Sequence, residues 1–264
     1  MKGKTHHKRG QSFTELAIFM PILILLLAGM VEVTFLFNDY LQMLDAVRNG
    51  SRESSDSDPF PGNVDSAPPS AVSGAYDDYK DCSTTQNFFR RTGCNTNDGL
   101  GPLKMNLSTP YSGAVVNTCN GTGQSATFQD DIVISIFSIA RVGASGSETL
   151  ELKRYDNNQV SGGVGQLVED TNQSGWSLMD DFMSTSFGGV GNMCSAVTIA
   201  QITTRLSGTN IPLVPNTAFV LVEVFKRHYQ LFNVPGFGDV IPNPIPVVSY
   251  AIFPLVSAEP TPTP

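Results

Sequence analysis

Charged side chains are scarce in this chain of 264 residues, where they occupy 15% of positions against about 25% in typical soluble proteins. Lys and Arg together number 16 and Asp and Glu 24, so the formal net charge is −8. Binding to nucleic-acid phosphates needs clustered basic side chains. The composition therefore argues against a nucleic-acid-binding protein. Glycine (24) and proline (17) are both frequent, which indicates many turns.

The chain also lacks the short motifs of common enzyme classes. It contains no G-x-S-x-G, no H-E-x-x-H and no Walker loop. Its glycine-rich stretches at 161–166 and 187–192 have no lysine of the kind that phosphate-binding loops use, so we interpret both as turns. No nucleophile partner for His228 is visible, and we interpret it as a lone surface or edge histidine. The sequence thus predicts a protein that is not an enzyme and has no cofactor.

Cysteine is limited to four positions, all of them after residue 80. No C-x2-C pair and no nearby histidine are present, so a metal site is not expected. In an exported domain the four would meet an oxidising compartment and form disulfides. Three pairings are open, of which Cys82 with Cys94 is the natural local one. The candidates are Cys82, Cys94, Cys119 and Cys194.

A long apolar run is the most informative feature that is present. It begins at Leu16, ends at Phe37 and has 22 residues, and about 20 are enough to cross the hydrocarbon core of a bilayer. Lysines and an arginine precede it, while acidic residues dominate after it. The positive-inside rule therefore places the N-terminus in the cytoplasm and the acidic bulk outside. A cleaved secretory signal fits less well, because the run is too long and no A-x-A-like site follows.

Two carboxylates accompany this run. Glu15 immediately precedes it and Glu32 lies inside it. A carboxylate in the middle of a membrane costs roughly 3 kcal/mol, so such groups usually have partners. Glu15 has a simpler interpretation as an acid at a helix N-terminus, where the helix dipole favours it. Glu32 also has a simpler interpretation, as a residue near the outer membrane–water interface.

The spacing around Glu15 resembles a type IV prepilin processing site. The string K-R-G-Q-S-F-T-E-L places Gly10 five residues before Glu15. The resemblance implies that a peptidase cuts after Gly10, which makes Gln11 the first mature residue and Glu15 the fifth. It also implies that Glu15 docks subunits by neutralising the new amino group of a neighbour. Gln11 departs from the Phe or Met that is more common there.

A wider resemblance covers about 45 residues. From Arg9 to Arg52 the chain looks like the TadE-like family of pseudopilins from the Tad tight-adherence pilus system. The resemblance implies a non-enzymatic role in assembling an adhesive pilus or in the linked secretion machine. It implies other pilins, the inner-membrane assembly platform and a prepilin peptidase as partners. The matching positions are Gln11, Glu15, Pro21, Glu32 and the A-V-R-N-G-S-R stretch at 46–52, which has Val47 and Ser51 where the family usually has Ala.

The domain organisation follows from these features. We expect a basic leader at 1–12, a transmembrane helix and stem at 13–53, a linker at 54–75, an exported domain at 76–256 and a disordered tail at 257–264. The helix is expected from about 13 to 48, with Gly50 and the Ser/Asp run ending it. Apolar stem residues recur at helical spacing and are expected to pack mainly on the protein's own domain, while packing on the stems of neighbouring subunits is an alternative that can hold as well. They are Phe37, Tyr40, Leu41, Leu44 and Val47.

The exported domain is predicted to be α+β, a long helix followed by an antiparallel, β-rich body with short helices. Strands are expected at 132–140, 148–155, 218–229 and 245–255, the first two as a hairpin. Helices are expected at 196–206, 86–91 and 177–185. A rival interpretation is a signal-anchored adhesin domain with no pilus role. That rival treats the spacing from Gly10 to Glu15 as coincidence.

Overall fold

The computed structural model describes residues 11–56, 59, 88–105, 119, 128–143, 147, 149–156, 168–171, 174–179, 193–208, 217–232 and 243–255. The chain divides into two compact units. The first, here called the anchor unit, comprises residues 1–39 and 228–245. The second, the sheet unit, comprises residues 40–227 and 246–264.

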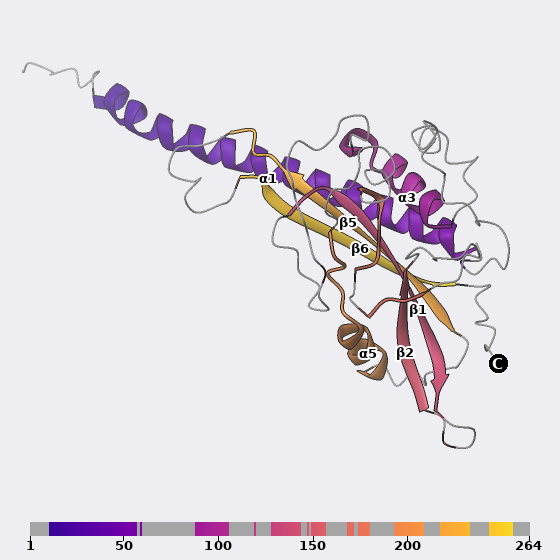
Figure 1. Cartoon of the computed structure of the whole chain (residues 1–264). Helices are drawn as coiled ribbons and strands as arrows, with labels where there is room; N and C mark the ends of the chain where they lie inside the picture. The colour runs from indigo at the N-terminus through magenta and orange to yellow at the C-terminus, as the bar shows by residue number, and fades with distance from the viewer. Residues whose placement is uncertain are drawn as a thin grey trace, which may run out of the picture. The chain divides into compact units, whose positions relative to one another are not determined.

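The helix α1 runs from Gln11 to Ser55, a length of 45 residues (Figure 1). Every described side chain from position 13 to position 27 is exposed, although most of them are apolar. Pro21 lies within this part and removes one backbone donor, which helices in membranes tolerate. The apolar helix expected from the sequence is therefore confirmed.

The helix ends later than the sequence predicted. It continues through Gly50 because this glycine faces the helix α3, Phe88–Gly99, at very short range. A Cβ at Gly50 would lie 2.0 Å from Oγ1 of Thr96. One turn further on, the hydroxyl oxygens of Ser54 and Thr92 are 2.5 Å apart. Close packing of two helices thus outweighs the poor helix propensity of glycine, which costs about 1 kcal/mol relative to alanine.

The buried face of the stem is rotated from the predicted one. Met43, Ala46 and Val47 are fully buried in the core of the sheet unit. Tyr40 and Leu41, predicted to lie on the packed face, are exposed. The expectation that the stem packs on its own domain is confirmed, but only Leu44 and Val47 of the predicted residues contribute to that packing.

One six-stranded sheet forms the centre of the sheet unit, which confirms the α+β class. The strand order is β3-β2-β1-β5-β6, with β4 pairing β1. β1 is antiparallel to β2, β4 and β5, and β1 with β2 is the expected hairpin. The strands are β1 Asp131–Val142, β2 Thr149–Asp156, β3 Val168–Glu169, β4 Trp176–Ser177, β5 Ala218–His228 and β6 Ile245–Leu255.

Both faces of the central strands are covered. Ile134 pairs with Val222, and both side chains join the cluster that contains the stem and α3. Phe137 and Leu221 point to the opposite face, where they pack against the helix α5, Ile199–Gly208. The sheet unit is therefore layered, with the stem and α3 on one face of the sheet and α5 on the other (Figure 1).

The remaining expectations meet the structure unevenly. The helix predicted at 196–206 is observed as α5, and the short one at 86–91 is part of the longer α3. A 3-10 turn, Gly101–Leu103, follows α3. The strands β3 and β4 were not predicted, and both have only two residues. The leader at 1–10, most of the linker at 54–75, most of the helix expected at 177–185 and the tail at 257–264 lie outside the described residues.

Candidate membrane anchor and assembly site

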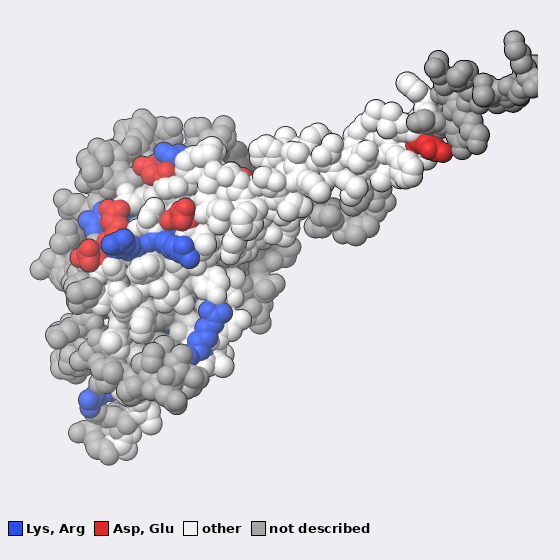
Figure 2. Space-filling model, turned by 180° about the vertical axis from the view of Figure 1, so that it is seen from behind, with Lys and Arg blue, Asp and Glu red and all other residues white. Residues whose placement is uncertain are grey.

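The N-terminal part of α1 is long and apolar enough to cross a membrane, and none of the residues in its most apolar 18-residue window is buried. In Figure 2 the visible surface of this part carries no charge except for acidic atoms near its N-terminal end. Exposed apolar side chains on this scale are costly in water and favourable in lipid. The helix is thus a candidate single membrane span.

Glu15 lies near the start of this helix. Its side chain is exposed, and it occupies the fifth position of α1 counted from Gln11. Gly10, the predicted cleavage position, lies outside the described residues, as does the side chain of Gln11. Processing after Gly10 and subunit docking by Glu15 therefore stay predictions.

Glu32 has several hydrogen-bond partners in the anchor unit. Its carboxylate accepts backbone N–H bonds from Leu231, at 3.2 Å to Oε1 and 3.0 Å to Oε2, and from Phe232 at 3.3 Å. Oε1 is also 3.3 Å from Nε2 of His228. These donors compensate the cost of placing an acid on an otherwise apolar helix surface.

His228 is the residue that connects this site. Its side chain is only 5% exposed, and its Nδ1 lies 2.7 Å from Oδ2 of Asp39. The interpretation of His228 as a lone surface or edge histidine was therefore wrong. Each of the two ring nitrogens therefore contacts a different carboxylate of α1. The ring joins Glu32 and Asp39, which lie about two helical turns apart on α1.

The sequence held only part of this information. Glu32 and Asp39 are seven residues apart, which puts both on one face of a helix. His228 is 189 residues beyond Asp39, and no local pattern connects them. The contact exists because β5 ends at His228, within the anchor unit.

An apolar groove of about 740 Å³ lies along the same helix. One side chain from outside α1 lines it, Phe232, and the other lining residues belong to the candidate span. The predicted position Pro21 is among them. The lining residues are Phe13, Leu16, Ala17, Met20, Pro21, Ile24, Leu25, Ala28 and Phe232.

Residues 10–52 match the family described as TadE-like protein. The match confirms the resemblance and includes Gly10, Glu15, Pro21 and Glu32. It ends at Arg52, three residues before the end of α1. No curated protein and no solved structure matches the chain.

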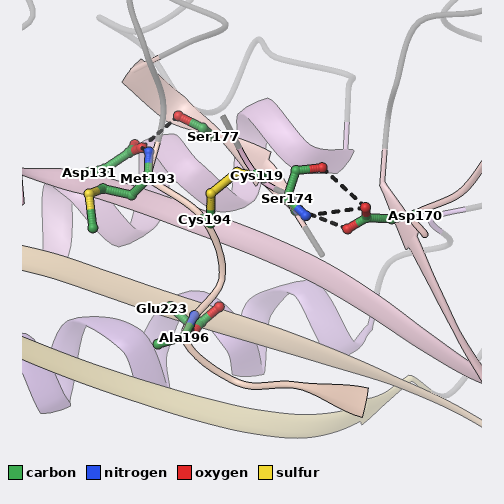
Figure 3. The surroundings of a disulfide bond; sticks show 10 residues. Cys119, Asp131, Asp170, Ser174, Ser177, Met193, Cys194, Ala196 and Glu223 are labelled. Atoms are coloured by element: carbon green, nitrogen blue, oxygen red, sulfur yellow. Dashed lines mark hydrogen bonds between the residues drawn. A yellow bond between two sulfur atoms is a disulfide. The ribbon is translucent and has the colours of Figure 1, made fainter. Parts of the chain in front are cut away.

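Outside the TadE-like segment, the sheet unit contains a buried carboxylate, Asp131, at the start of β1 (Figure 3). Its Oδ2 accepts a 2.6 Å bond from the Ser177 hydroxyl and a 3.0 Å bond from the N–H of Met193. Its Oδ1 accepts from the N–H groups of Ile132 and Met179. Burial raises the pKa of Asp131 to about 6, although these hydrogen bonds act in the opposite direction.

A second buried acid, Glu223 on β5, binds the same connecting segment. Its Oε1 accepts N–H bonds from Ala196 at 2.9 Å and from Val197 at 3.2 Å. Burial raises the pKa of Glu223 to about 7, and Ser195 and the Arg154 charge partly offset this rise. Arg154 is itself fully buried, donates to Ser195 and to the carbonyl of Val197, and lies 4.7 Å from the ring centre of Phe137.

A disulfide joins this segment to a distant part of the chain. Cys119 is bonded to Cys194, with a Cα–Cα distance of 5.7 Å (Figure 3). Cys94 is also disulfide-bonded, while Cys82 lies outside the described residues, so the pairing of those two stays a prediction. Residues 193–197 are thus held by two buried acids, a buried arginine and a disulfide. This cluster therefore has a structural role, since it fixes residues 193–197 against the sheet.

The described residues contain no group of three His, Cys, Asp or Glu side chains able to hold a metal ion. Glu32, His228 and Asp39 do not form one, because the two carboxylates contact opposite nitrogens of the ring. The glycine-rich stretches at 161–166 and 187–192 lie outside the described residues. The described contacts around Glu32, His228 and Phe232 are hydrogen bonds and apolar contacts.

Proposed function

We propose that this protein is a non-enzymatic pseudopilin or minor pilin of a Tad-type pilus system. It takes part in pilus assembly or in the associated secretion and adhesion. The observation on which this rests is the TadE-like match over residues 10–52, with an exposed acid five residues after Gly10. The proposal makes α1 the element that holds the protein in the membrane and packs it against other subunits.

The exposed surface of α1 supports this role. Between positions 13 and 27 the helix buries no described side chain, so its whole circumference is open to lipid or to another helix. The apolar surface also extends beyond the span, because Tyr40 and Leu41 are exposed on the stem. Helices of neighbouring subunits can bury this surface against one another once they leave the bilayer.

Glu15 sets how the helices of neighbouring subunits align along their length. A carboxylate facing lipid costs roughly 3 kcal/mol, and pairing with a cation recovers part of that cost. If the chain is cut after Gly10, Gln11 acquires an α-amino group. The amino group of one subunit then attracts Glu15 of the next, because both lie at the same end of the helix.

The proposed orientation places the basic leader in the cytoplasm and the sheet unit outside. The proposed partners are the lipid bilayer, other pilins and pseudopilins, the inner-membrane assembly platform and a prepilin peptidase. Cutting by that peptidase would leave Gln11 as the first residue, which mass spectrometry of the native protein detects. The disulfides agree with an exported sheet unit, since they persist in oxidising compartments.

The decisive experiment is Glu15→Gln in the native host, with Glu53→Gln as the matched control. Glu53 is also an exposed acid of α1, but it lies on the stem. Loss of the Glu15 pairing is expected to reduce site-specific cross-links between subunits at least about tenfold, which corresponds to 1.4 kcal/mol. Pilus assembly should fall with them, while membrane levels of the protein stay unchanged.

The control variant should behave as wild type. Unchanged cross-linking and assembly in Glu15→Gln would contradict the pilin proposal. The rival adhesin interpretation predicts that outcome, because a signal-anchored domain needs no acid at this position.

A further inference from the structure

The segment that follows β5 carries an unusual set of exposed side chains. Tyr229 is 60% exposed, Leu231 62% and Phe232 46%. Apolar and aromatic residues next to one another on a surface mark a contact site more often than isolated ones do. Residues 229–232 belong to the anchor unit, together with the candidate span.

Two observations place this segment beside the span. The backbone N–H groups of Leu231 and Phe232 are bound by Glu32. The ring of Phe232 also lines the apolar groove together with Ile24 and Ala28, which lie toward the N-terminus from Glu32. Ala28 is four residues from Glu32, or about 6 Å along the helix at 1.5 Å per residue. Phe232 therefore lies alongside the lipid-facing part of α1.

We propose that residues 229–232 insert into the outer leaflet of the bilayer beside α1, held there by Glu32. The protein would then contact the membrane through a second, non-helical segment as well as through its span. This inference rests on the proposed membrane anchoring and goes beyond the pilin role. Its partner is the lipid bilayer, contacted through the acyl chains and not through a specific headgroup.

The hydrogen bonds explain how an irregular segment can occupy that position. A backbone N–H that faces hydrocarbon without an acceptor costs several kcal/mol, so irregular chain is found at membrane depth only where its polar groups are bound. Glu32 accepts from both N–H groups that lie nearest to the span. The same contacts account for Glu32, because its carboxyl group faces two backbone N–H donors and the ring of His228 in place of lipid.

The side chains suit a membrane boundary. Leu231 and Phe232 are apolar throughout, and Tyr229 combines an aromatic ring with a polar hydroxyl. Tyrosine is enriched at the level of the headgroups for this reason. The buried ring of His228, which directly precedes this segment, contacts Asp39 through Nδ1 at 2.7 Å.

Tryptophan fluorescence in reconstituted protein tests the proposal. The chain has one tryptophan, Trp176, which is 7% exposed in the core of the sheet unit and gives the baseline. Phe232→Trp adds a second fluorophore, and the full-length protein is placed in nanodiscs of phosphatidylcholine brominated on its acyl chains. We expect the added fluorescence to fall at least twofold relative to unbrominated lipid.

Two further variants make each outcome informative. Phe19→Trp, on the exposed apolar part of α1, should be quenched at least as strongly, whereas Tyr250→Trp, exposed on β6, should not be quenched. Quenching at position 19 with none at position 232 would overturn this inference and leave the anchor intact. Absence of quenching at both positions would refute the membrane anchor itself.

The holding role of Glu32 is tested in the Phe232→Trp protein. Glu32→Ala removes the acceptor of both N–H groups, and quenching at position 232 is expected to fall by more than half. Asp45→Ala, an exposed acid of α1 outside the span, is the control and should leave quenching unchanged. Equal quenching in the two variants would contradict the role given to Glu32. Quenching at position 232 that falls as the number of protein copies per nanodisc rises would indicate a second copy as the occupant, and would also overturn the proposal.

Discussion

Replacing Glu223 by glutamine should make the protein more stable at alkaline pH, although it removes an ionisable group from the centre of the sheet unit. Glu223 is fully buried, and its pKa is raised from the ordinary 4.5 to about 7. In the folded protein the carboxyl therefore holds its proton more tightly than in the unfolded chain. The substituted amide would imitate the protonated form and keep an oxygen for the N–H groups of Ala196 and Val197.

The sign follows from proton linkage. Between pH 4.5 and 7 the folded state binds more protons than the unfolded state, so the free energy of unfolding falls as the pH rises through this window. Above the folded pKa the loss is complete. A shift of about 2.5 units at 1.36 kcal/mol per unit amounts to about 3 kcal/mol. The pKa of Asp131 is raised to about 6, so this residue also lowers the free energy of unfolding as the pH rises from about 4 to 6.

The assay is urea unfolding of the full chain in detergent, followed by Trp176 fluorescence. At pH 4 the Glu223→Gln variant and the wild type should have similar free energies of unfolding. At pH 8 the variant should be more stable by about 3 kcal/mol, because only the wild type must ionise a buried acid. Glu169→Gln, at a partly exposed acid paired with Lys153 on the neighbouring strand, should change stability by less than about 1 kcal/mol at either pH.

Parallel pH profiles of the wild type and Glu223→Gln would refute this reasoning. A variant less stable than wild type at pH 8 would do so as well. The first result would mean that Glu223 is not desolvated in solution. The second would mean that the ionised carboxylate stabilises Arg154 by more than its own burial costs.

Two further predictions concern packing and cross-linking. Replacing both Cys119 and Cys194 by alanine removes the disulfide that closes a loop of 75 residues, and should lower the free energy of unfolding by about 4 kcal/mol on the chain-entropy estimate, measured by urea unfolding of the double variant and the wild type without reductant. Gly50→Ala should cost about 1–3 kcal/mol, because its Cβ would lie 2.0 Å from Oγ1 of Thr96. The double variant Gly50→Ala/Thr96→Ala should regain part of the lost stability, because it lacks the clashing Oγ1. Gly29→Ala is the control and should have no such cost, since a Cβ at position 29 would meet nothing within 4 Å. Equal effects at both glycines would contradict the packing of α1 on α3.

The sequence was sufficient wherever a feature depends on near neighbours along the chain. The apolar run from Leu16 to Phe37 predicts a helix of membrane-spanning length, because the length of an apolar run and the rise per residue of a helix can be read from the sequence itself. Alternation of apolar residues located the hairpin of β1 and β2 to within a few residues. The spacing of Gly10, Glu15, Pro21 and Glu32 identified the TadE-like segment.

The same local reasoning failed where the outcome depends on what packs opposite. The sequence predicted that α1 would end near Gly50, but α3 provides a surface that only a glycine can approach so closely. The predicted stem face included Tyr40 and Leu41, yet the sheet unit buries Met43 and Ala46. The stem helix carries apolar side chains on several of its own faces, so the spacing of apolar residues alone did not show which of these faces is buried.

Only the tertiary structure decided which polar groups meet. It brings His228 to Glu32 and Asp39 across almost 200 residues, and it places Asp131 and Glu223 on either side of Cys194. From sequence alone, His228 was a solitary residue and the two acids of the sheet were ordinary strand positions. A buried charge requires a partner, and a folded chain can supply that partner from any distance along the sequence. The sequence by itself therefore determined the helix, the main strands and the resemblance of the N-terminal segment to the TadE-like family, while the environment of each buried acid was decided by the fold.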